Sequence, residues 1–184
     1  MSGQQRGGRR PGATAGKGAK RPGAPGEPVE AVPNPRRIAI DALLRIEQDG
    51  AYANLLLPKL LGRSGLSERD RAFATQLVYG TVRNRRACDW FVERYALGDL
   101  DDTVRAALRL GTFQLRFLGT PARAAVSATV DVVPRKARGF VNAVLRKIAA
   151  ANDAWPSDAV RLSYPDWLVD RLVAGGFVTV RPHA

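Results

Sequence analysis

Apolar residues recur at helical spacing through the middle of the chain, in segments separated by start and stop signals. The first segment follows Asn34-Pro35, a pair that suits the N-cap and first position of a helix, and it ends at Gly50. Its apolar face comprises Ala39, Ala42, Leu43 and Ile46. A short apolar stretch over residues 52–61, interrupted by Pro58, comes next.

Further segments also show helical spacing of apolar residues between start and stop signals. Ser67 stands three residues before Asp70, which resembles a capping box and predicts a helix start. Between Arg83 and Arg85 the chain either bends or runs on into a helix that Gly98 ends. The later helices are predicted from Asp101 to Gly119, from Thr120-Pro121 to Pro134, and through Val141, Val144, Leu145 and Ile148. Because sustained period-two alternation is missing, the sequence predicts an all-α bundle of six or seven helices.

Composition divides the chain into three parts. Residues 1–35 hold eight of the eighteen glycines and six of the twelve prolines, with six basic and two acidic residues, and predict a disordered basic tail. Residues 36–150 form the predicted helical domain. Residues 151–184 contain a predicted helix from Pro165 to Gly175 and are too short for a domain. We interpret them as a linker that either folds back on the bundle or leads to a domain that is missing.

The formal net charge of +12 favours a polyanionic partner. Residues 36–150 carry most of the excess, with twenty basic and eleven acidic side chains. Any single arginine is simplest to explain as part of a solvated surface, whereas the clusters together favour phosphate recognition by planar guanidinium groups. The ten candidate RNA-binding residues are Arg36, Arg37, Arg83, Arg85, Arg86, Arg135, Lys136, Arg138, Arg146 and Lys147.

One predicted helix presents its basic residues on a single face. Arg138, Asn142 and Arg146 lie at positions i, i+4 and i+8, turned away from the apolar face, and predict a basic ridge. Aromatic side chains that stack on unpaired bases are a second expected feature of such a surface. The candidates are Tyr79, Trp90 and Phe140, and each is expected to fill the core instead.

Residues that would support catalysis or metal binding are scarce. The chain has one cysteine and one histidine, which excludes disulfide frameworks and Cys/His zinc sites. Cys88 adjoins Asp89 on an apolar helix and is expected to be a packed thiol. The Asp101-Asp102 pair is explained by helix capping. We predict no catalytic, metal or cofactor site in this chain, and neither a membrane span nor a secretory signal, so the expected location is the cytoplasm.

Four ordered stretches go beyond generic helices. They are Leu77-Val78-Tyr79-Gly80-Thr81-Val82-Arg83, Leu108-Arg109-Leu110-Gly111-Thr112-Phe113-Gln114-Leu115, Pro121 through Val126, and Gly139-Phe140-Val141-Asn142-Ala143-Val144-Leu145-Arg146. Together they resemble the NusB-like RNA-binding domain. The Phe-Val-Asn-Ala-Val-Leu-Arg phrase and Tyr164-Pro165-Asp166-Trp167-Leu168 favour the version at the N-terminus of the Sun/Fmu (RsmB-type) ribosomal RNA cytosine-C5 methyltransferases.

The resemblance covers about residues 36–176 and implies a seven-helix fold that binds RNA, with small-subunit ribosomal RNA as the expected partner. In that family a domain that binds S-adenosylmethionine and carries the catalytic cysteines follows the region matched here, so we expect a chain truncated before its catalytic half. One departure is Arg123, where such sequences often carry histidine, and we attach no function to this position.

Three hypotheses for the function remain open. The first is an RNA-binding module that presents ribosomal RNA to a methyltransferase domain. The second is a free-standing NusB-like module that works in transcription antitermination or rRNA processing beside a ribosomal or antitermination protein. The third is an inert remnant of a broken gene.

Overall fold

The computed structural model describes residues 33–177. The predicted tail therefore lies outside the described residues except for its last three positions, and so do residues 178–184. The described part is helical throughout and contains no strand, which confirms the predicted all-α class. Its elements are α1 (Pro35–Gln48), α2 (Ala53–Gly62), α3 (Glu68–Arg83), α4 (Arg85–Tyr95), α5 (Asp102–Arg116), α6 (Ala122–Asp131), the 3₁₀ turn η1 (Arg135–Ala137), α7 (Arg138–Ala150), α8 (Asp158–Arg161) and α9 (Asp166–Ala174).

Side-chain caps start three of the helices where the sequence predicts them. The Asn34 side chain accepts hydrogen bonds from the first free amides of α1. At α3 the Ser67 hydroxyl accepts from the amide of Asp70 at 3.1 Å. Asp101 accepts from the amide of Thr103 at 3.0 Å and so caps α5. Each cap satisfies backbone amides that have no partner within the helix.

At two places the structure adds to what the sequence pattern predicts: the helix around Pro58 and the junction at Asn84. Helix α2 continues through Pro58 although proline removes one backbone hydrogen bond. Its burial of Leu57, with neighbouring leucines packed on the core, compensates for that loss. At Asn84 the chain bends between α3 and α4, and the Asn84 side chain donates to the carbonyl of Gly80 at 2.9 Å.

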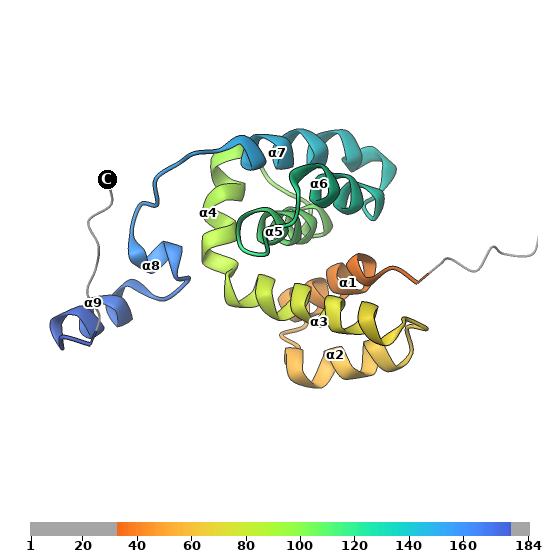
Figure 1. Cartoon of the computed structure of the whole chain (residues 1–184), viewed down its shortest axis with the longest axis horizontal. Coiled ribbons are helices and arrows are strands. Elements are labelled where there is room, and N and C mark those ends of the chain that lie inside the picture. Colours follow the sequence, from red (N-terminus) through yellow and green to blue (C-terminus); the bar gives the residue numbers. More distant parts are fainter. Residues whose placement is uncertain (1–32, 178–184) are drawn as a thin grey trace, which may run out of the picture. The chain divides into compact units, whose positions relative to one another are not determined.

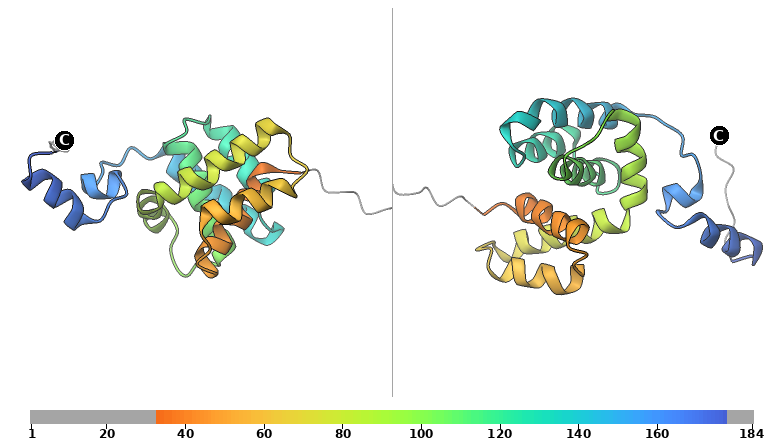
Figure 2. Two further views of the ribbon diagram at one scale, coloured as in Figure 1. Left: turned by 90° about the horizontal axis from the view of Figure 1, so that it is seen from below. Right: turned by 180° about the vertical axis from the view of Figure 1, so that it is seen from behind.

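Helix α5 is the centre of the bundle. It contacts α1 and α3 on one side and α4, α6 and α7 on the other, so that two groups of helices share it. Figures 1 and 2 show these groups as α1 to α3, in orange and yellow, and α4 to α7, in green and blue. Nine consecutive residues, 106–114, are buried. The sequence predicts a one-sided apolar stripe here, and the helix is covered all round because both groups pack on it.

Two glycines permit the close approach of helices around α5. A Cβ on Gly111 would lie 2.6 Å from the side chain of Leu145 on α7. A Cβ on Gly80 of α3 would overlap the ring of Phe113. Both glycines belong to the sequence stretches quoted above, so their packing role explains part of that pattern.

A buried ion network joins α1, α4 and α5. Arg109 of α5 is 8% exposed, and its Nε and Nη2 donate to the two carboxylate oxygens of Asp89 on α4 at 2.5 and 3.0 Å. Its Nη1 donates to Glu47 of α1 at 3.1 Å. These carboxylates raise the pKa of Arg109 against the lowering effect of its burial. The guanidinium therefore stays charged inside the protein because two helices supply its counter-charges.

The C-terminal described segment packs on the bundle. The Trp155 ring lies 5.3 Å from Trp90 and 5.1 Å from Phe91, measured between ring centroids. Helix α8 contacts α4, and the Ser163 hydroxyl accepts from the amide of Ala87 at 2.9 Å. Trp155, α8 and Ser163 therefore all contact α4.

The ion network generates a stability prediction. Changing Asp89 to Asn leaves the Arg109 charge with one carboxylate, and we expect the free energy of unfolding to fall by about 2 kcal/mol or more. The matched control is Asp41→Asn. It removes the ion pair between Arg45 and Asp41, whose side chains are 48% and 46% exposed. That variant should lose less than about 0.5 kcal/mol. Urea titration followed by far-UV circular dichroism measures the free energy of unfolding of both variants. Equal losses would show that the Arg109 network contributes no more to stability than an exposed ion pair.

Close packing at Gly111 generates a second prediction. Gly111→Ala should lower the free energy of unfolding by about 1–3 kcal/mol, because the new methyl group displaces Leu145. Gly139→Ala is the control, since nothing lies within 4 Å of a Cβ at that helical position. This control should gain up to about 1 kcal/mol from helix propensity. Opposite signs in thermal or urea unfolding are the expected result, and two stabilised variants would contradict the packing account.

Candidate nucleic-acid interface

The ten predicted site residues separate into two groups. Six of them are exposed, and their side chains make no hydrogen bond or ion pair with any other residue of 33–177. This group comprises Arg37, Arg83, Arg135, Lys136, Arg146 and Lys147. In the other group, Arg36, Arg85, Arg86 and Arg138, the guanidinium groups are engaged in contacts within the fold.

Arg36 anchors the start of α1. Its Nε donates to the side-chain oxygen of Gln114 at 2.8 Å, and its guanidinium lies 4.9 Å from the centroid of the Phe73 ring. Burial lowers the pKa of Arg36. The neighbouring Arg37 is exposed, so the predicted Arg36-Arg37 pair presents one of its two charges freely to a ligand.

Arg85 and Arg86 both form ion pairs. Arg85 belongs to the network on α1, since its Nη2 lies 2.7 Å from a carboxylate oxygen of Glu47. Arg86 pairs with Asp166 of α9 at 2.7 Å and also donates to the carbonyl oxygen of Tyr164. Arg86 thus attaches the C-terminal segment to α4.

Arg138 is directed at the end of α6. Its Nε and Nη2 donate to the carbonyl oxygens of Val133 and Asp131 at 3.3 and 3.2 Å. Arg146, two turns further along α7, makes no such contact and lines a groove together with Asn142. The predicted ridge of Arg138, Asn142 and Arg146 therefore presents one fully free charge, at Arg146.

The free charges gather most densely on the hairpin of α6, η1 and α7. Residues 122–150 contain six basic side chains and a single acidic one, Asp131. Arg135, Lys136, Arg146 and Lys147 are exposed there, and so is Arg123 on α6. The sequence analysis attached no function to Arg123 because it stands where similar sequences often carry histidine, and the pairing of α6 with α7 is what adds it to this group.

Exposed aromatic rings accompany these charges. Phe140 is 41% exposed on α7, and Tyr79 is 37% exposed on α3, so the expectation that both fill the core is wrong. Trp90 is half-buried in the aromatic cluster with Phe91 and Trp155, as expected of a core residue. Phe140 adds an apolar platform to the basic α7 surface.

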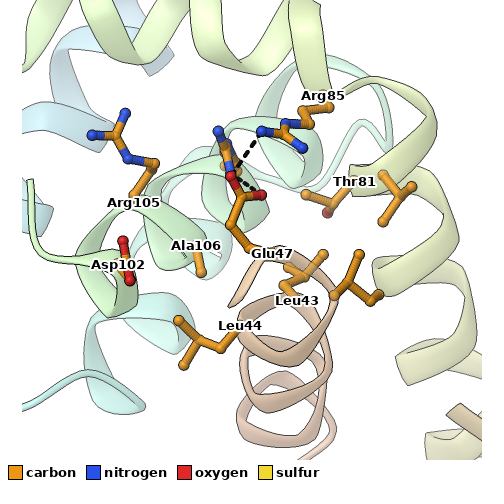
Figure 3. Close-up of a pocket in the computed structure, with 11 residues that line it drawn as sticks. Leu43, Leu44, Glu47, Thr81, Arg85, Asp102, Arg105 and Ala106 are labelled. Carbon is orange, nitrogen blue, oxygen red and sulfur yellow. Dashed lines mark hydrogen bonds and ion pairs between the residues drawn. The ribbon is translucent and has the colours of Figure 1, made fainter. Parts of the chain in front are cut away.

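A small cavity lies beside the ion network. Its volume is about 40 Å³, and Leu43, Glu47, Thr81, Arg85 and Asp102 are among the side chains around it. Figure 3 shows Glu47 reaching across this cavity towards Arg85. The Thr81 hydroxyl is buried without a hydrogen-bond partner in the described part of the protein. The space suits water molecules rather than an organic ligand.

The structure shows the environment of Cys88 and of the potential metal ligands among residues 33–177. Cys88 is fully buried, and burial together with Asp89 raises the pKa of its thiol, which confirms a packed thiol. Within residues 33–177 no three potential ligands gather to hold a metal ion, and no helix is long and apolar enough to cross a membrane.

Known proteins of similar sequence are methyltransferases. The chain is 39% identical over 155 residues to a putative methyltransferase of Mycobacterium tuberculosis, an alignment that covers 80% of this chain and 33% of the relative. It is 40% identical over 141 residues to ribosomal RNA small subunit methyltransferase B of Thermus thermophilus, covering 74% and 34%. The chain thus spans about a third of the length of the curated relatives it matches.

Solved structures and a family model agree on the fold. NusB of T. maritima superposes with a TM-score of 0.57 at 21% identity, covering 63% of this chain and 88% of that one. A structure of the antitermination factors NusB and NusE in complex with dsRNA gives 0.58 at 27% identity, covering 63% and 93%. The model of the NusB family matches residues 33–150. The bundle of α1 to α7 is therefore a NusB domain, homologous to the N-terminal region of the methyltransferases, and the chain belongs to the NusB family.

Proposed function

We propose that this NusB domain binds small-subunit ribosomal RNA and presents it to a methyltransferase domain of the kind found in the longer relatives. The observation that carries the proposal is the charge of the α6–α7 hairpin, which contains six basic side chains and a single acidic one. Most of these cations are exposed and unpaired within the described residues. Such side chains neutralise phosphates and release counterions, which drives binding to nucleic acid.

The relatives point to the class of RNA. Those of Bacillus subtilis and Thermus thermophilus are named as ribosomal RNA small subunit methyltransferases B, the former as a probable one. In this proposal the described residues supply recognition, while S-adenosylmethionine and the catalytic groups belong to the part of such proteins that the match does not cover. Binding of ribosomal RNA also implies the cytoplasmic location that the sequence predicts.

The proposal predicts a steep dependence of RNA affinity on salt. The log–log plot of the association constant against salt concentration should have a clearly negative slope, measured by fluorescence anisotropy with a small-subunit rRNA hairpin. Changing Arg135 and Lys136 together to Ala should weaken binding and make the slope shallower by about 1–2.

The matched control is the double change of Arg69 and Arg71 to Ala, which removes the same charge from α3. These arginines are exposed, but Glu68 and Asp70 flank them and offset their field. The control should bind RNA nearly as tightly as the parent protein. A flat salt dependence, or an equal loss in both double variants, would contradict the proposed function.

A protein partner is the second candidate function, and α2 carries the observation that favours it. Tyr52, just before α2, is 75% exposed, and Leu55 within it is 60% exposed, one helical turn apart. Large apolar side chains exposed next to each other mark interaction surfaces. One structural relative is a NusB in complex with NusE, which makes NusE the natural probe.

Binding to NusE is tested without RNA. Purified chain and NusE should co-elute in size-exclusion chromatography after nuclease treatment, and Leu55→Glu should abolish co-elution because it places a charge in the apolar contact. Leu97→Glu is the control, since Leu97 is 87% exposed after α4, outside α2. Separate elution of the unaltered proteins, or equal effects of both variants, would remove this candidate.

A further inference from the structure

An open groove runs between α6 and α7. Its volume is about 790 Å³, within the range of roughly 300–1,000 Å³ that is typical of sites for organic ligands. Its lining combines the apolar side chains of Val126, Val130 and Ala149 with the polar side chains of Arg123, Ser127 and Asn142. These polar side chains make no hydrogen bond with other residues of 33–177, so they are available to a ligand.

The groove is electrically polar along its length. Because α6 and α7 form an antiparallel hairpin, the start of α6 lies beside the end of α7 (Figure 1). This arrangement brings Arg123 and Arg146 to one end of the groove. Asp131 is the last residue of α6 and belongs to the other end, while Asn142 lies on α7 one turn before Arg146, between the two ends. One end therefore suits a phosphate, and the rest of the groove suits groups that donate and accept hydrogen bonds.

We infer that this groove holds one unpaired nucleotide of an RNA strand. Its phosphate lies at Arg123 and Arg146, and the edge of its base meets Asn142. Guanidinium groups bind phosphate strongly, and unpaired bases are read through hydrogen bonds to their exposed edges. This inference rests on the proposed RNA-binding function and adds the form of RNA and the site that takes it.

The dimensions of the groove favour an unpaired nucleotide over a duplex. The groove is a hollow on the surface between two packed helices, and its volume of about 790 Å³ is that of a site for a small organic ligand, so it can take one base but not the full width of a double helix. The small side chains of Ala149 and Ala150 at the end of α7 keep the groove open near the two arginines. A duplex would meet only the rim, through phosphate contacts.

The test compares three RNA probes of equal length by fluorescence anisotropy at fixed salt: a single strand, a blunt duplex of the same sequence, and a single strand with abasic sites. The single strand should bind the unaltered protein most tightly. Arg123→Ala should weaken that binding about tenfold, the effect of one lost charged hydrogen bond. Arg69→Ala, on α3, is the matched control for loss of one exposed charge and should have little effect.

Ser127→Leu fills the groove without changing its charge. An aliphatic residue is chosen because an aromatic one would stack on a base. This variant should lose the preference for the intact strand over the abasic strand, while its salt dependence stays that of the unaltered protein. Far-UV circular dichroism verifies the fold of each variant, and Arg123→Ala tests the groove independently because Arg123 is exposed on α6.

The outcomes separate this inference from the proposed function. If RNA binding depends on salt but is unchanged in Arg123→Ala and Ser127→Leu, the groove is not the nucleotide site and RNA binding remains. Equal affinity for the intact and abasic strands would lead to the same conclusion. A failure to bind any of the three probes would overturn both. Weaker binding of the single strand by Arg123→Ala, together with loss of the preference for the intact strand in Ser127→Leu, would establish the site.

Discussion

The ion pairs of the buried Arg109 guanidinium with Asp89 and Glu47 are the interaction on which the arrangement of the bundle depends. The guanidinium lies on the central helix and needs counter-charges from α1 and α4 at the same time. An unpaired charge at this depth costs several kcal/mol, so the helices that carry Glu47 and Asp89 are held in one orientation relative to α5. Apolar packing alone would tolerate small rotations of these helices, whereas a two-sided ion pair does not. The network thus fixes how the two groups of helices meet.

That fixed geometry allows the α6–α7 hairpin to act as a rigid surface. Helix α7 packs on α5 through the close contact at Gly111, and Arg138 ties the beginning of α7 to the end of α6. The basic side chains of the hairpin therefore project from helices that are packed on α5 and hydrogen-bonded to each other. A preorganised surface loses less conformational entropy on binding than a flexible one.

The sequence predicted local features well and distant partnerships poorly. The caps at Asn34, Ser67 and Asp101 were predictable because each depends on residues two or three positions apart. Arg86 seemed equivalent to Arg83, yet its partner Asp166 lies 80 residues away, and no local pattern reveals that pairing. Arg123 was set aside because it departs from the residue that similar sequences carry, and only the pairing of α6 with α7 brings it to the same groove as Arg146. Periodicity likewise located α5 but did not show that both groups of helices cover it.

The attachment of the C-terminal segment has a consequence for its dynamics. Helix α9 buries only Val169, and Arg86 of α4 forms an ion pair with Asp166 at its start. Cooperative units that bury little apolar surface open at lower free energy than the core of the same protein. Amide hydrogens of α9 should therefore exchange with solvent through local opening, whereas those of α5 should exchange only when the whole protein unfolds. We therefore expect a graded stability, in which α9 opens and closes many times during the lifetime of a folded bundle.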